Sequence, residues 1–149
     1  LVGLNGAGLI DNTDNTDMII TQTLLDELTA KAKVSPRLRA NYDLRNSMDD
    51  QSQRMLEAIE PGYKSSIHRH QKTSETIVCI RGKLVVEYYD ELERICSEST
   101  IITPNGQVVA VNVPLGQWHS LHAVESGTVI MVCKNEHYEP IGPVDVLTL

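Results

Sequence analysis

Residues 62–82 decide the fold of this chain, and they read Gly62-Tyr-Lys-Ser-Ser-Ile-His68-Arg-His70-Gln-Lys-Thr-Ser-Glu75-Thr-Ile-Val-Cys-Ile-Arg-Gly82. His68 and His70 are two positions apart, so on a strand both imidazoles leave the same face. Glu75 follows after a polar run that favours a turn. Two imidazoles and one carboxylate can therefore converge on one point, and that combination binds divalent metal ions.

A fourth candidate ligand lies in residues 113–119, Val-Pro-Leu-Gly-Gln-Trp-His. Pro114 and Gly116 favour a turn of restricted geometry, and the alternation after it predicts a strand that carries His119 back toward the first three residues. Two other interpretations stay open. A lone His-x-His is more often a surface pair, and His119 by itself could be a core histidine capped by a carbonyl or a neighbour of Trp118. The combined spacing favours a metal site.

These segments resemble the two cupin motifs. Residues 62–82 fit the first motif, Gly-x5-His-x-His-x4-Glu-x6-Gly, at every position. Pro114, Gly116 and His119 resemble the core of the second motif, although Ala123 stands where that motif usually has asparagine. The resemblance implies a cupin jelly roll that binds one metal ion through His68, His70, Glu75 and His119. The asparagine is not a metal ligand in the family, so its absence leaves metal binding intact and weakens only the analogy to a particular enzyme.

Beyond the motifs, the chain looks like the WbuC-type cupin fold metalloproteins. An N-terminal helix is followed by residues that match the family's pattern, namely Ser35, Pro36, Arg37, Arg39, Asn41, Asp49, Gln53, Arg54, Lys134 and Tyr138. The resemblance implies a small metal-binding cupin, of a kind typically found with surface-polysaccharide (O-antigen type) biosynthesis, whose reaction is not well defined.

Length and charge narrow the class of protein further. The 149 residues are enough for one domain with a substantial core, and the net charge of −7 without a basic cluster makes nucleic acid and anionic membranes poor partners. Cys79, Cys96 and Cys133 lie in apolar runs, not at metal-type spacing, so we expect reduced thiols and a cytoplasmic location. Residues 1–17 are rich in Gly, Asn and Asp, and we expect them to be an extension outside a single cupin domain at 18–149.

The element pattern predicts an all-β protein with one N-terminal α-helix. Leu24, Leu25, Leu28 and Ala32 recur at helical spacing, Thr21 or Thr23 can cap the helix, and Pro36 forbids its continuation. Short β-branched or apolar runs then follow at regular spacing, which indicates an antiparallel sandwich or barrel. The predicted strands cover 54–60, 65–70, 75–81, 83–90, 95–103, 107–113, 118–123 and 128–134, and residues 135–149 are expected to run over the surface.

Seven residues are candidates for binding a substrate: Arg39, Asn41, Tyr42, Arg54, Arg81, Lys134 and Tyr138. Arg39, Asn41 and Tyr42 could form a lid over the barrel mouth, or they could pack the helix against a strand. Arg81 shares the parity of Glu75 and on an unbulged strand would point into the barrel, whereas a hairpin end would leave it in solvent. Cations and neutral donors concentrated here favour an anionic or hydroxyl-rich small-molecule ligand.

Three classes of function fit this sequence. A metal-dependent cupin acting on a sugar-like or carboxylate ligand, as an isomerase or epimerase, is the leading hypothesis. An iron-dependent dioxygenase and a non-catalytic sugar-binding module are the alternatives. The ligand set admits iron, manganese, nickel, cobalt or zinc, and the catalytic residues stay open. Residues 76–80 and 108–111 are apolar on both faces, so we also expect a homodimer.

Overall fold

The computed structural model describes residues 19–149, so the predicted extension 1–17 lies outside the described residues. Helix α1 (Gln22–Val34) begins with the Thr21 side chain, which accepts a hydrogen bond from the backbone N–H of Leu24. Its last residue is Val34, and Ser35 caps its C-terminal end directly before Pro36. The predicted helix and the capping role of Thr21 are confirmed.

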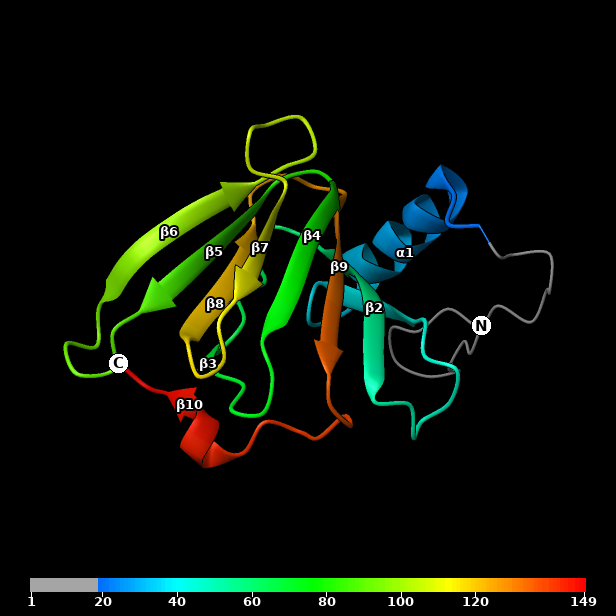
Figure 1. The fold of residues 1–149 in the computed structure, drawn as a ribbon. Helices are drawn as coiled ribbons and strands as arrows, with labels where there is room; N and C mark the ends of the chain where they lie inside the picture. The colour runs from blue at the N-terminus through cyan, green and yellow to red at the C-terminus, as the bar shows by residue number, and fades with distance from the viewer. Residues whose placement is uncertain (1–18) are drawn as a thin grey trace.

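Within residues 19–149, ten strands form two antiparallel sheets (Figure 1). The first sheet has the order β1-β2-β9-β4-β7 and is made of β1 (Arg39–Asp43), β2 (Ser52–Ile59), β9 (Thr128–Asn135), β4 (Glu75–Arg81) and β7 (Ala110–Val113). The second sheet has the order β10-β3-β8-β5-β6 and is made of β10 (Val146–Leu147), β3 (Ile67–His68), β8 (Trp118–Ala123), β5 (Leu84–Tyr89) and β6 (Cys96–Ile102). The predicted all-β sandwich with an N-terminal helix is confirmed.

Two separate apolar clusters hold the molecule together. The first contains Ile59, Ile77, Leu84 and Ile130, all fully buried, and draws on strands of both sheets. The second contains Leu25 and Leu28 of α1, with Tyr42, Leu56 and Val129 of the first sheet. Helix α1 therefore covers the outer face of that sheet, next to β2 and β9 (Figure 1). Burial of such side chains supplies most of the favourable free energy of folding.

Two segments differ from the predicted pattern. Residues 39–43, for which no strand was predicted, form β1, which pairs antiparallel with β2. The chain end, expected to run over the surface, contains a 3-10 turn, Pro143–Asp145, and then β10, which pairs with β3. Both strands are short, and β1 is mixed in polarity. Their backbone groups are satisfied by partners far along the chain, and no local pattern specifies those partners.

Candidate metal centre

The four predicted metal ligands meet at one end of the sandwich. His68 on β3 pairs directly with His119 on β8, and this register brings the two imidazoles together. Glu75 is the first residue of β4 in the opposite sheet, and His70 lies in the connection between β3 and β4. One ligand atom from each of the four side chains lies within 4.8 Å of every other. All four residues are buried or nearly so, and the group could hold a metal ion.

Neighbouring oxygen atoms define the tautomers of the histidines. Nδ1 of His68 lies 2.8 Å from the carbonyl oxygen of Ser66, and Nδ1 of His119 lies 2.9 Å from that of Gln117. A carbonyl oxygen only accepts hydrogen bonds, so each Nδ1 carries the proton and each Nε2 presents a lone pair. Nδ1 of His70 faces the carboxylate of Glu136 at 3.6 Å. The lone pairs therefore lie on the nitrogen atoms that can bind a metal.

The Nε2 atoms and Glu75 form a cradle that suits a cation. Nε2 of His119 lies 3.3 Å from one carboxylate oxygen of Glu75, and Nε2 of His70 lies 3.2 Å from the other. Within the described residues, the buried Nε2 of His70 makes no hydrogen bond. A lone pair that faces a carboxylate oxygen is unfavourable unless a proton or a metal ion lies between them. These donors therefore fit a divalent cation.

The electrostatic environment keeps the ligands in the form that binds a metal. Burial, together with the neighbouring His119, lowers the pKa of His68 to about 4. Burial by itself would raise the pKa of Glu75, but its contacts with His119 and His70 and the nearby Lys134 ammonium hold that pKa well below its usual range. At neutral pH the site therefore offers a neutral His68 imidazole and a charged carboxylate.

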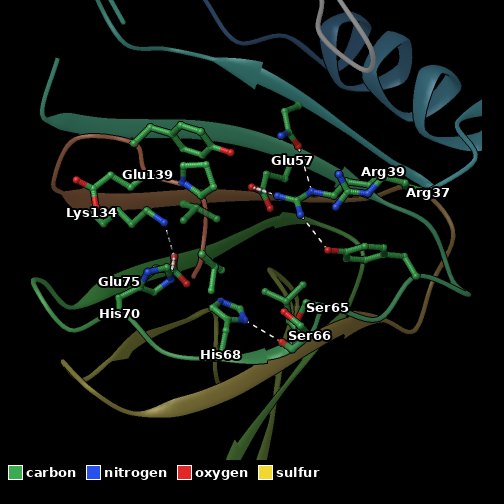
Figure 2. A pocket seen from close by; sticks show the side chains of 17 residues that line it. Arg37, Arg39, Glu57, Ser65, Ser66, His68, His70, Glu75, Lys134 and Glu139 are labelled. Carbon is green, nitrogen blue, oxygen red and sulfur yellow. Dashed lines mark hydrogen bonds and ion pairs between the residues drawn. The ribbon is translucent and has the colours of Figure 1, made fainter. Parts of the chain in front are cut away.

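A cavity of about 350 Å³ opens next to His68, His70 and Glu75. Its far wall carries Arg37 and Arg39 (Figure 2). This volume is at the small end of the range for small-molecule sites.

Four of the seven candidate substrate residues line this cavity: Arg39, Asn41, Lys134 and Tyr138. Arg39 is held in place by three hydrogen bonds, 2.5 Å to Glu57, 2.9 Å to the hydroxyl of Tyr63 and 3.2 Å to Asn41. Mainly because of the Glu57 charge, the pKa of Arg39 is raised above its ordinary value. The ammonium of Lys134 lies 3.4 Å from Glu75. It therefore contacts a candidate metal ligand as well as the cavity.

The other three candidates, Arg81, Tyr42 and Arg54, do not line this cavity. Arg81 follows a register shift between Cys79 and Arg81 that changes its direction, and it binds Asp26 and Thr29 of α1. Tyr42 is fully buried in the cluster beneath the helix. Arg54 pairs with Asp50 at 2.9 Å, outside the cavity.

Sequence reasoning missed Glu57 and Tyr63, which hold Arg39 in place. Glu57 lies opposite Asn41 in the pairing of β1 with β2. Once residues 39–43 are recognised as a strand, the alternation of Arg39 and Asn41 places both on one face. A strand prediction for this segment could therefore have located Glu57 as a cross-strand neighbour.

A family model described as a domain of unknown function (DUF6016) matches residues 20–101, more than half of the chain. No protein with a curated description matches the sequence.

Three solved structures illustrate the likeness in fold. CapF, a capsular polysaccharide assembling protein from Staphylococcus aureus, matches with a TM-score of 0.59 and 18% identity over 72% of this chain. KdgF from Halomonas sp. matches with a TM-score of 0.55 and 15% identity, over 70% of this chain and 85% of its own. A cupin 2 domain-containing protein from Halorhodospira halophila matches with a TM-score of 0.53 and 16% identity, over 70% of this chain and 68% of its own.

The matched region spans only 30% of the CapF chain. At these identities the matches establish the fold, and the predicted cupin β-sandwich is confirmed. Among residues 19–149, no helix has the length and apolar composition needed to cross a membrane.

Proposed function

Because this chain belongs to the DUF6016 family and folds as a cupin, we propose that it holds one divalent metal ion through His68, His70, Glu75 and His119 and uses it to bind or convert a small polar ligand. The observation that carries the proposal is the arrangement of the Nε2 atoms. Two backbone carbonyls fix the tautomers of His68 and His119, and two Nε2 atoms face the carboxylate of Glu75.

The chain's own residues prepare the site for this role. A bound divalent ion can polarise a carbonyl group or lower the pKa of bound water. Glu75 neutralises one of its two charges, and the histidines add none, so the ion keeps a positive charge that favours an anionic or hydroxyl-rich ligand. Lys134 holds one oxygen of Glu75, and the cavity beside the ligands leaves room for a small molecule.

The finer assignment is a WbuC-type cupin that acts on, or binds, a sugar-like or carboxylate molecule in surface-polysaccharide (O-antigen type) biosynthesis. Two features support it. The residues that resemble this family, Arg39, Asn41 and Lys134, line the cavity beside the metal ligands, and CapF is described as a capsular polysaccharide assembling protein. An isomerase or epimerase role is our first choice of reaction.

Metal analysis of the purified protein tests this proposal. We expect about one divalent ion per chain, and none in the double variant His68→Ala/His70→Ala. Calorimetry of the metal-loaded protein with nucleotide sugars, hexoses and sugar acids then identifies the ligand class. An absence of stoichiometric metal after loading with iron, manganese, nickel, cobalt or zinc contradicts the proposal. Oxygen consumption with a bound ligand would favour the dioxygenase alternative, and tight binding without turnover would favour the binding module.

We also propose a cytoplasmic homodimer built from one cupin domain per chain. Helix α1 covers Ile80, which packs against the cluster beneath it, but Val108 and Val109 remain 43% and 47% exposed. Exposed apolar side chains next to an edge strand favour association with a second copy. Sedimentation that gives a monomer at micromolar concentration contradicts the dimer.

A further inference from the structure

We propose that Arg37 forms a second anchoring point for the ligand, and that the ligand is a small molecule with metal-binding oxygen atoms at one end and a carboxylate or phosphate at the other. This inference rests on the proposed metal site and extends it to the substrate class. Figure 2 shows the two ends of the cavity, with His70, Glu75 and Lys134 on one side and Arg37 and Arg39 on the other.

The ion pairs around the cavity single out Arg37. Six charged side chains line it: Arg37, Arg39, Lys134, Glu57, Glu75 and Glu139. Arg39 pairs with Glu57 at 2.5 Å, Lys134 contacts Glu75 at 3.4 Å, and Glu139 pairs with Lys72 at 3.3 Å. Within residues 19–149, Arg37 has no carboxylate partner. An unpaired guanidinium at a cavity wall binds planar anions well, because it donates paired hydrogen bonds.

Arg39 is less suited to this role than Arg37. Three of its N–H groups already donate, to Asn41, Tyr63 and Glu57, and Glu57 neutralises its charge. It therefore serves as a fixed part of the wall against which a ligand packs. Arg37, in contrast, has a positive charge that no carboxylate neutralises among the described residues, so it can pair with a second negative group on the ligand.

The backbone holds Arg37 at the edge of the cavity. Its N–H donates to the Ser35 side chain at 3.2 Å, and the N–H of Leu38 donates to the carbonyl oxygen of Ser35 at 3.0 Å. Leu38 itself has a φ of 55°, a left-handed conformation that costs energy for a residue other than glycine. This turn joins α1 to β1 and positions the two arginines at one wall.

The total charge of the occupied cavity favours the same class of ligand. The three lining cations balance the three lining carboxylates while the histidines are neutral, so a divalent metal ion leaves a surplus of two positive charges. These charges lie in a chain whose net charge is −7. An anion with two separated negative groups can meet both the metal and Arg37, whereas an anion with one group meets only one of them.

Calorimetry with 2-hydroxy acids tests this inference on the metal-loaded protein. Lactate carries only the metal-binding end, malate and 2-hydroxyglutarate add a carboxylate at two distances, and 3-phosphoglycerate adds a phosphate. We expect at least one of the three longer probes to bind about 10-fold or more tightly than lactate. In Arg37→Gln that advantage disappears, while lactate affinity and metal content stay unchanged. The Arg37 side-chain Nε–Hε NMR signal should shift with the preferred probe and not with lactate.

Two matched variants serve as controls. Arg37→Lys keeps the charge but loses the paired donors, so it should retain only part of the advantage. Lys33→Gln removes an exposed cation of α1 that does not line the cavity, and it should change nothing.

The failures of the two proposals are distinguishable. If no longer probe binds more tightly than lactate, or if Arg37→Gln weakens lactate and the longer probes equally, the inference on Arg37 is wrong and the metal site stands. A metal-loaded protein that binds none of the probes also overturns the inference. If the parent protein takes up no metal at all, the proposed function fails first.

Discussion

The two faces of the sheet β1-β2-β9-β4-β7 are built from alternate residues of the same strands, but they have opposite tasks. On β1, Arg39 and Asn41 line the cavity, whereas Ala40 and Tyr42 are buried beneath α1. On β9, Val132 and Lys134 line the cavity, whereas Met131 packs against the helix cluster. A one-residue change of position along a strand therefore moves a side chain from the site to the structural core.

The contrast also shows how each face is stabilised. The outer face depends on apolar area, because the α1 cluster is made of leucine, alanine, valine and tyrosine side chains. The inner face around the site depends on paired charges, such as Arg39 with Glu57 and Lys134 with Glu75. Substitutions on the outer face should therefore change the stability of the protein, and substitutions on the inner face around the site should change its binding of metal and ligand.

Removing a ligand on the inner face should have the largest effect. We expect His119→Ala to weaken metal binding by more than ~100-fold, since losing only the hydrogen-bond partner of a metal ligand costs about 10–100-fold. His122→Ala is the matched control, because His122 lies on the same strand but its partly exposed side chain contacts Glu87 and not the four candidate ligands. Elemental analysis after dialysis gives the result. Equal metal content in the two variants would show that His119 is not a metal ligand.

Disturbing the outer face should cost stability and leave metal binding intact. Leu28 of α1 is fully buried between the helix and the sheet, so Leu28→Ala should lower the free energy of unfolding by about 2–5 kcal/mol. Glu27→Ala, at an exposed position of the same helix, should stay within about 0.5 kcal/mol of the parent. Urea unfolding measures both variants. A loss of metal from folded Leu28→Ala would show that the two faces are coupled.

The stability of the metal-free protein should depend on pH through His68. Its pKa of about 4 in the folded chain is below its ordinary value of 6.5, so the unfolded chain binds a proton more readily. The contribution of neutral His68 to the free energy of unfolding, about 3 kcal/mol, is fully present above pH 6.5 and is lost as the pH falls toward 4. Unfolding curves between pH 7.5 and 4 measure it, with His68→Gln as the control. The same slope in parent and variant would contradict the assignment.

The smallest effect should come from Arg81, the candidate that moved to the outer face. Arg81 joins α1 to the sheet through Asp26, Thr29 and the carbonyl oxygen of Gly127. Because these contacts are partly exposed, Arg81→Gln should cost only about 1 kcal/mol of stability and leave ligand binding unchanged. Arg37→Gln should instead weaken binding of the longer probes and leave the stability unchanged. Reduced ligand affinity in Arg81→Gln would show that Arg81 contributes to ligand binding.

Local patterns predicted most of the elements. The range 75–81 matches β4, which is an apolar run that ends before Gly82, and 118–123 matches β8, whose polar and apolar residues alternate after the turn at Pro114 and Gly116. The mixed polarity of residues 39–43 concealed β1, since a half-polar edge strand has the composition of a loop. The predicted strand at 65–70 is shorter in the structure, at Ile67–His68, where His68 pairs with both β8 and β10.

The sequence by itself determined the class of fold and the four residues that meet in the candidate metal centre. Both depend on short-range spacing, since His68, His70 and Glu75 lie within eight residues of one another, and the turn at Pro114 and Gly116 returns the chain toward them. The tertiary structure decided which polar residues surround the site. A register shift turned Arg81 toward α1, and cross-strand pairing placed Glu57 beside Arg39. These outcomes depend on strand register between distant segments, which no local spacing encodes.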